Sequence, residues 1–173
     1  DSPRRKRRKR FSMDSCSKRG MSDGELVRGF NELHYSNGGE PMFDKYNGIS
    51  IVAAGDGWAE GELEVSRHSL NPHGIVHGGA LAALADTVGG AATFAAYRRG
   101  CVTVNYSMNF LRPAWGSNRK IRCRAQAVKL GRTLSVFGMS LTDDEGMEVA
   151  SGNFTFYITG WMKSEEEKEP GAI

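Results

Sequence analysis

The sequence is poor in cysteine and has no long apolar run, and both shortages limit what the protein can be. Its three cysteines, Cys16, Cys101 and Cys123, are scattered through 173 residues. They match neither a disulfide framework nor the spacing of a zinc site, so we expect reduced thiols in a cytoplasmic compartment. No stretch of about 18 apolar residues occurs, so neither a transmembrane helix nor a membrane partner is expected.

Aromatic residues are also sparse, at 9%, but a hydrophobic content of 39% still suffices for one core. The length of 173 residues favours a single domain, because typical domains run to about 100–200 residues. Glycine is abundant by comparison, with 22 residues, which indicates many turns or close backbone contacts.

The body of the chain lacks an excess of either charge. The formal net charge is +3, yet residues 1–10 alone contribute +6, whereas residues 11–162 sum to −1 and residues 163–173 to −2. A nucleic-acid-binding domain carries its basic residues on a folded face, so no nucleic-acid partner is expected for the folded body. We predict a disordered basic leader over residues 1–20, a single domain over 21–160 and an acidic C-terminal tail over 161–173.

The leader has no apolar segment after its charges, which argues against a secretory signal. A solvated tail is the simplest explanation of these basic residues. Nuclear targeting, or a patch that binds nucleic acid or anionic lipid, is the alternative. Order is predicted to begin near Ser22, which forms a capping box with Glu25. Leu26, Phe30 and Leu33 then share one face of a short amphipathic helix.

A period of two predicts strands on both sides of one apolar helix. The expected strands cover residues 49–53 and 58–65, joined by the turn Gly55-Asp56-Gly57, and then residues 102–110, 121–127, 133–142 and 147–159. Between them, Leu81, Leu84 and Val88 have helical spacing, which predicts a long buried helix over residues 80–97. A glycine C-cap after Arg98 and Arg99 is expected to end it.

The order strand-strand-helix-strand-strand-strand-strand predicts an α+β fold, in which one antiparallel sheet wraps around one long central helix. A short N-terminal helix precedes this unit. Such a sheet leaves part of the helix and one edge strand uncovered, so we expect a homodimer.

Asp86 differs from the rest of the predicted helix, because it is the only charged side chain between His77 and Arg98. A carboxylate in an apolar helix costs several kcal/mol unless it is paired or used. The bare amides of Gly78 and Gly79 at the helix start would suit a developing negative oxygen. Asp86 follows Gly79 by two turns, or about 10 Å. Two antiparallel helices across a dimer axis would close this gap.

These residues belong to a longer pattern, which runs Asn71-x-x-Gly74-x-x-His77-Gly78-Gly79 and reaches Asp86 after six further residues. It resembles the active-site motif of hotdog-fold acyl-CoA thioesterases of the phenylacetate-pathway (PaaI-like) type. The resemblance extends through residues 102–104, 110–114, 131–132 and 149–156, and so covers roughly residues 40–160. It implies the hotdog fold and an enzyme that hydrolyses acyl-CoA thioesters, as a homodimer or homotetramer with active sites at the subunit interface.

The resemblance also implies roles for single residues. Asp86 is expected to be the nucleophile or general base, and the Gly78 amide to polarise the thioester carbonyl. Asn71 would orient the carbonyl or the attacking water, and Thr103 lies where relatives place a hydroxyl near that water. Some relatives carry Thr one turn after the acidic residue, where this chain has Gly90, so a required hydroxyl must come from Thr103 or Thr87.

Further expectations concern the substrate, and none requires a cofactor or a metal. Gly79, together with Arg112 and Arg132 at the ends of adjacent strands, is expected to bind substrate, the arginines through the CoA phosphates. Arginines on a surface are as often only solvated. His73 and His77 are four residues apart, but the loop context and the lack of a nearby carboxylate argue against a metal pair.

Each assignment has a structural alternative. Asp86 could cap or pair across a dimer, His77 could bond backbone instead of acting as a base, and the glycines could serve close packing. At the level of function, the alternative is a non-catalytic acyl-CoA-binding module with a regulatory role. A related hotdog hydratase would pair Asp with His in a different motif, which is missing here.

Overall fold

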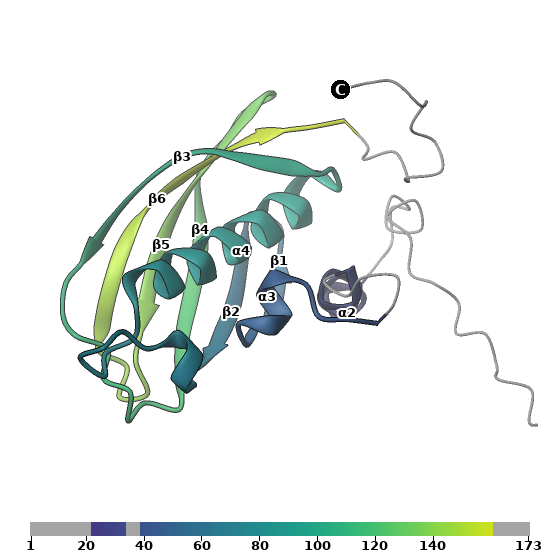
Figure 1. Ribbon diagram of the computed structural model, residues 1–173. Helices are drawn as coiled ribbons and strands as arrows, with labels where there is room; N and C mark the ends of the chain where they lie inside the picture. Colours follow the sequence, from purple (N-terminus) through teal and green to yellow (C-terminus); the bar gives the residue numbers. More distant parts are fainter. Residues whose placement is uncertain (1–21, 34–38, 161–173) are drawn as a thin grey trace, which may run out of the picture.

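The computed structural model describes residues 22–33 and 39–160, and it confirms the predicted α+β architecture. A six-stranded antiparallel sheet curls around one long helix, α4 (Gly78–Tyr97), which lies along its concave face (Figure 1). The predictions for the leader at 1–20 and for the tail at 161–173 lie outside the described residues.

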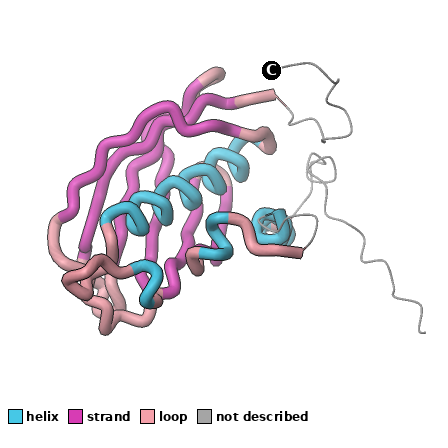
Figure 2. Tube along the Cα trace, viewed as in Figure 1, coloured by secondary structure: helices cyan, strands magenta, loops and turns pink. Residues whose placement is uncertain are grey.

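The strands lie side by side in one sheet (Figure 2), in the order β1-β2-β4-β5-β6-β3. Every neighbouring pair is antiparallel. Their bounds are β1 Ile49–Gly55, β2 Trp58–Glu64, β3 Cys101–Phe110, β4 Lys120–Leu130, β5 Leu134–Thr142 and β6 Glu148–Ile158. Strand β3 pairs with β6 and not with β4, the next strand in the chain. Both sides of β4 are taken by β2 and β5, so residues 111–119 carry the chain from the β3 edge past β6 and β5 to the middle of the sheet.

Helix α4 packs one side onto the sheet and leaves the other side uncovered by it. Leu84, Ala85 and Val88 are fully buried. Gly89 permits the close approach, because a Cβ atom there would lie only 2.5 Å from Met139 Cε and from Phe156 Cζ. The expected glycine C-cap is wrong: Arg98 caps the helix itself, in the left-handed conformation with φ at 54°.

By length and composition α4 could cross a membrane, and it is the one helix among the described residues of which this is true. Its window is 56% buried inside the molecule, however, and buried core helices of soluble proteins have the same composition.

Two small elements cover the β1 side of the sheet. Helix α2 (Asp23–Leu33) begins with the predicted capping box, in which the backbone N–H of Ser22 donates to Glu25 at 2.9 Å. Leu26 of α2 is 2% exposed in the core, whereas the side chain of Leu33 lies outside the described residues. A one-turn helix, α3 (Phe43–Tyr46), follows in a segment for which the sequence pattern predicts no helix.

Candidate active site at the start and middle of helix α4

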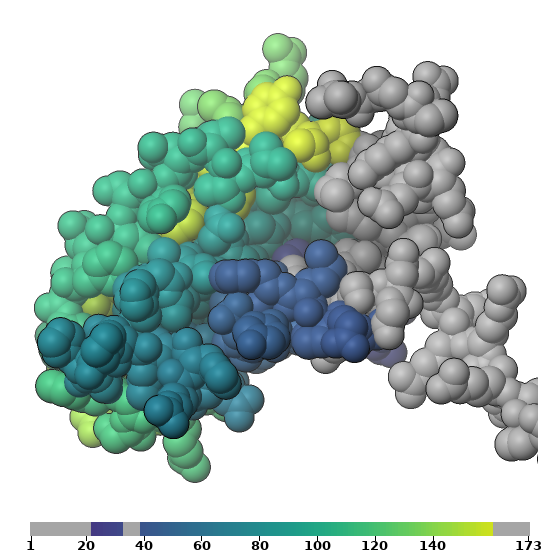
Figure 3. Space-filling view, in the orientation of Figure 1, coloured from purple at the N-terminus to yellow at the C-terminus, as the bar shows by residue number. Residues whose placement is uncertain are grey.

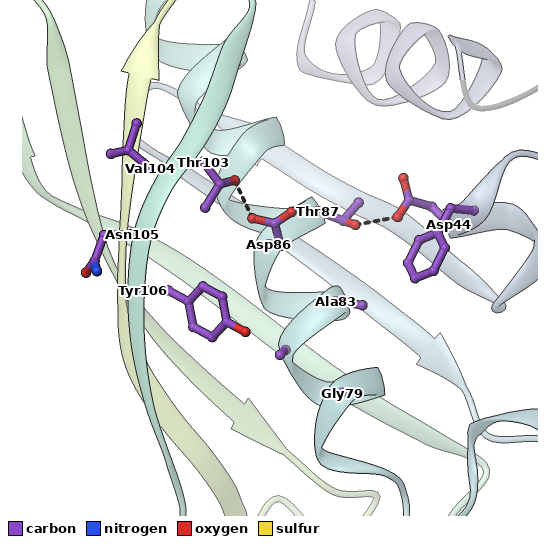
Figure 4. Close-up of a pocket in the computed structure, with 11 residues that line it drawn as sticks. Asp44, Gly79, Ala83, Asp86, Thr87, Thr103, Val104, Asn105 and Tyr106 are labelled. Atoms are coloured by element: carbon purple, nitrogen blue, oxygen red, sulfur yellow. Dashed lines mark hydrogen bonds between the residues drawn. The ribbon is translucent and has the colours of Figure 1, made fainter.

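Asp86 lies on the side of α4 that the sheet leaves uncovered. Its carboxylate accepts a hydrogen bond from the hydroxyl of Thr103 on β3 (Figure 4). The side chain is still accessible to solvent in the single chain, and so it is not the deeply buried carboxylate that an apolar helix suggests. Partial burial nevertheless raises the pKa of the Asp86 carboxyl; the Thr103 hydrogen bond opposes this rise, and the negative charge of Asp44 adds to it.

Asp86 opens onto a cavity of about 670 Å³ between α4, β3 and α3. In the space-filling view, the surface of α4 is recessed between these two flanking elements (Figure 3). Apolar side chains make up much of the wall, and Gly79 lines the same cavity as Asp86, which confirms that the two residues share one helix face. The lining residues are Phe43, Asp44, Gly79, Ala82, Ala83, Asp86, Thr87, Thr103, Val104, Asn105 and Tyr106.

The first turn of α4 is capped by His77. Its Nδ1 atom accepts a hydrogen bond from the Gly79 amide at 2.8 Å. A neutral ring that accepts at Nδ1 carries its proton on Nε2, so it offers a donor and no second acceptor. His77 therefore fits the structural reading better than the general-base one. The expectation of a bare Gly79 amide is wrong, since His77 occupies it.

The Gly78 amide, by contrast, has no hydrogen-bond acceptor within the described ranges 22–33 and 39–160. It sits at the positive end of the α4 dipole, where an unpaired N–H favours a negatively charged oxygen. A cavity of about 460 Å³ adjoins it, lined on the other side by Phe110 and Arg112.

Asn71 holds the loop that leads into α4. Its Oδ1 atom accepts from the amides of His73, at 2.9 Å, and Ile75, at 3.2 Å. The side-chain carbonyl is thus used to fix the loop, whereas the Nδ2 group has no partner among the residues that the structure describes. The loop is further tied down at His77, whose amide donates to the Ser69 carbonyl at 2.7 Å.

The structure therefore brings the predicted residues together in two groups. Asp86, Thr103 and Gly79 surround the larger cavity, whereas Gly78 and Arg112 share the smaller one at the helix start. Asp86 and Gly78 lie slightly more than two helical turns, or about 12 Å, apart along α4.

The two arginines expected to contact CoA do not lie at the ends of adjacent strands. Arg112 follows β3 at the start of α4. Arg132 lies in the turn between β4 and β5, next to Gly131, whose carbonyl accepts from the Tyr97 hydroxyl at the end of α4. The reason is the strand order, in which β6 separates β3 from β5. One chain therefore presents the two arginines at opposite ends of the sheet.

Sequence reasoning missed two residues of the larger cavity, Asp44 and Tyr106. Asp44 belongs to the unpredicted helix α3, whose single turn is too short to show a helical period. The Thr87 hydroxyl donates to its Oδ1 atom at 2.6 Å. Tyr106 could have been predicted from the alternation of its strand, which places it on the inward face. Its ring stacks on that of Phe154, with the ring centroids 4.7 Å apart.

The site offers carboxylates, hydroxyls and amides. In the described part of the chain no group of three or more His, Cys, Asp or Glu side chains is placed to hold a metal ion. A partly desolvated carboxylate beside a hydroxyl can act as a base or as a nucleophile, and an unpaired amide at a helix start can stabilise an oxyanion.

Comparison with known proteins finds a matching family and related sequences. A family model described as Thioesterase superfamily matches residues 73–150. A putative esterase of Haemophilus influenzae is 33% identical over 100 residues, which cover 57% of this chain and 71% of that protein.

Solved structures agree in fold. A thioesterase of Haemophilus influenzae superposes with a TM-score of 0.70 at 25% identity, covering 86% of this chain and 97% of its own. A Streptococcus mutans protein bound to acetyl-CoA gives 0.62 at 29% identity, with 66% and 91% covered. The Escherichia coli PaaI protein, from the phenylacetic acid degradation operon, gives 0.71 at 24% identity, with 83% and 100% covered.

Proposed function

Because the chain belongs to the thioesterase superfamily, we propose that it hydrolyses acyl-CoA thioesters to a free acid and CoA, with Asp86 as the reacting side chain. The observation that carries the proposal is the placement of Asp86, which faces a largely apolar cavity and is oriented by Thr103. The raised pKa of this carboxyl strengthens it as a base. The acetyl-CoA bound to the Streptococcus mutans protein supports CoA as the thiol part of the substrate.

Two routes lead from this carboxylate to the products. As a nucleophile, ionised Asp86 attacks the thioester carbonyl, the CoA thiolate leaves, and water then hydrolyses the mixed anhydride. As a general base, Asp86 takes a proton from water while that water attacks the carbonyl, and the C–S bond then breaks to release the CoA thiolate. A thiol with a pKa of about 8.5 leaves readily, so neither route needs a strong general acid. Thr103 holds the carboxylate in place for both routes.

The carbonyl oxygen gains negative charge in both routes and needs donors. We assign this role to the Gly78 amide, which has no acceptor among the described residues. The Nδ2 group of Asn71 is a second donor, available because only Oδ1 is used within the loop. His77 supports the pair by capping the helix start and holding the Gly79 amide away from the substrate.

A homodimer is part of the proposal, because the two groups of residues are too far apart in one chain. Strand β3 forms an open edge whose Val102, Val104 and Tyr106 side chains are each 53% exposed. Antiparallel pairing of two such edges would set two copies of α4 side by side and antiparallel. Asp86 would then face Gly78 of the partner subunit across the axis, and a further pairing of dimers into a tetramer is compatible with this arrangement.

The same pairing accounts for the two separated arginines. It brings the start of one β3 next to the end of the other, so that Arg132 of the partner subunit approaches the end of the sheet that carries Arg112. Both side chains then border the entrance to one proposed active site, where they could bind the CoA phosphates. We also propose a cytoplasmic location, where the free thiols of Cys101 and Cys123 stay reduced.

The test is thiol release from short, medium and aromatic acyl-CoAs by the wild type, Asp86→Asn and Asp86→Ala. We expect hydrolysis of at least one ester by the wild type and a loss of about 100-fold or more in both variants. Asp56→Asn removes a carboxylate from the exposed β1–β2 turn and should keep full activity. Binding of acyl-CoA without hydrolysis by the wild type would support the regulatory module instead. Full activity in Asp86→Asn would move the chemistry to another residue.

A further inference from the structure

The ring of Phe110 lies beside the start of α4, at the residue whose amide the proposed reaction uses. A Cβ atom on Gly78 would lie 3.3 Å from Phe110 Cζ, 3.5 Å from Cε1 and 3.7 Å from Cε2, so the tip of the ring faces this glycine. In a helix, Cα–Cβ bonds tilt toward the N-terminus, and the first N–H groups point the same way. The ring therefore lies on the side of Gly78 to which its amide is directed.

The backbone around Phe110 is fixed at both ends of a short segment. Phe110 is the last residue of β3 and pairs with Ala150 of β6. Ala114, four residues further on, is 1% exposed, and its carbonyl accepts from the Val76 amide at 2.8 Å. The segment 110–114 is thus attached to the sheet at one end and to the loop before α4 at the other, and it crosses the helix start in between.

The cavity of about 460 Å³ in front of Gly78 has an apolar wall. Among the described residues that line it, Arg112 is the one charged residue, and every other side chain in the wall is apolar. A hydrogen bond from an amide to a negatively charged oxygen is stronger where water is kept away. The edge of an aromatic ring is also its positive side, which suits such an oxygen.

The partner subunit of the proposed dimer would complete these surroundings. The partner subunit's Asp86 would face Gly78, and the partner subunit's Arg132 would border the entrance. The Phe110 side chain is 54% exposed in one chain, and the dimer would turn its open side toward the partner. The contact between the ring and Gly78 is made within one chain and needs no partner.

Resting on the function proposed above, we propose that Phe110 is a positioning residue, whose ring shields the Gly78 amide from water and so strengthens its hydrogen bond to the thioester carbonyl. The residue acts through Gly78 and takes no part in the bond changes. The carbonyl oxygen gains its negative charge only as the reaction proceeds, so the ring favours the transition state over the bound substrate. Loss of the ring should therefore lower kcat more than it changes KM.

The test measures kcat and KM of Phe110→Ala and Phe110→Leu with the acyl-CoA that the wild type hydrolyses best. We expect Phe110→Ala to lower kcat about 10-fold and to keep KM within about twofold of the wild type, because water then reaches the amide. Phe110→Leu keeps an apolar group and should lose less. Tyr157→Ala truncates an aromatic side chain that is 44% exposed on the outer face of β6, and it should keep both constants.

Gly78→Ala provides a second measurement that leaves β3 unaltered. Its methyl group would lie 3.3 Å from the ring tip and should displace the ring from the amide, so kcat should fall. In a Phe110→Ala background there is no ring to displace, and adding Gly78→Ala should cause little further loss. Independent effects would multiply instead, and that result would overturn the proposal.

Failure of the proposed function is distinguishable from failure of this role. If the wild type hydrolyses no acyl-CoA, the proposed function is wrong and the role of Phe110 falls with it. If the wild type is active, an unchanged kcat in Phe110→Ala, or a loss confined to KM, overturns the role of Phe110 alone. Light scattering shows whether Phe110→Ala keeps the oligomeric state of the wild type. If it does not, Gly78→Ala decides: a lowered kcat supports the proposal, and a wild-type kcat overturns it.

Discussion

The two edge strands of the sheet differ in how their outward backbone groups are hydrogen-bonded. At the β1 edge, Asn31 of α2 imitates a neighbouring strand: its Nδ2 group donates to the Ile51 carbonyl at 2.8 Å, and its Oδ1 atom accepts from the Ile51 amide at 3.1 Å. At the β3 edge, strand β3 pairs with β6 on one side only, and no described element pairs with its other side. The chain thus closes one edge with a side chain and leaves the other available.

The difference is informative because the open edge also borders the proposed active site. Strand β3 carries Thr103, which orients Asp86, and Tyr106, which walls the cavity. An unpaired strand normally invites aggregation, so soluble proteins protect such edges or pair them in a defined assembly. Closing β1 and leaving β3 open would direct the proposed self-association to the edge at which it completes the proposed site.

The largest effect is expected from placing a charge on each edge in turn. Val104 of β3 and Val52 of β1 are matched valines, 53% and 46% exposed. A twofold contact between β3 strands brings the new charges of Val104→Lys together, so that we expect a monomer and a loss of hydrolysis of about 100-fold or more. Val52→Lys should leave assembly and activity near wild type.

Light scattering and thiol release on the same samples check this prediction. An active, monomeric Val104→Lys protein would exclude a site shared between subunits. Equal disruption by both variants would mean that the two edges are not different in solution.

The next effect concerns the closed edge. Asn31→Ala removes both hydrogen bonds to Ile51 and leaves two backbone groups to find water, which should lower the free energy of unfolding by about 2 kcal/mol. Urea unfolding measures this change. Asn31→Asp keeps the acceptor but loses the donor, so an intermediate loss is expected. Hydrolysis per folded molecule should stay unchanged, because Asn31 lies at the edge opposite to β3; a selective loss of activity would contradict this division of roles.

A smaller effect is expected inside the open edge, from Thr103→Val. Its hydroxyl lowers the pKa of Asp86, so its removal raises that pKa further. In the proposed reaction Asp86 acts in its ionised form, so activity should fall as the pH drops through this pKa; the acid limb of the kcat/KM profile should therefore move to higher pH. We also expect kcat/KM to fall about 10-fold at neutral pH through poorer orientation. Thr103→Ser should restore both properties, whereas an unshifted limb would show that Asp86 does not set it.

The sequence alone predicts much of this molecule, for physical reasons that also explain the failures. Periods of two and of 3.6 residues identify the strands and α4, because each element buries one face. The place of β3 beside β6 is not a local property: it depends on which strand takes the free side of β4. The motif predicts Asp86 and Gly78 from spacing along one helix. Asp44 is missed because it reaches the cavity through a tertiary contact with Thr87 from a single helical turn.

The smallest prediction compares two carboxyls, one near each edge. In the fold, the pKa of Asp86 is raised, chiefly by partial burial, whereas the pKa of Glu25 on α2 is lowered, chiefly by the Ser22 backbone N–H. A raised pKa means that the ionised group opposes folding. This cost is absent below the unfolded pKa, near 3.9 for Asp, and is complete above the folded one. Asp86→Asn should thus melt about 1 °C or more above the wild type at pH 7, and level with it at pH 3.

Glu25 should show the opposite sign. Its lowered pKa means that the ionised form favours folding, a contribution present above the unfolded pKa and lost as the pH falls through the folded one. Glu25→Gln should therefore melt below the wild type at pH 7, with the difference shrinking toward acid pH. Thermal melts of both variants at the two pH values provide the check. If Asp86→Asn melts lower than the wild type at pH 7, then the ionised carboxylate stabilises the fold. Asp86 would then be a structural residue, and its proposed role in the reaction at the open edge would lose this support.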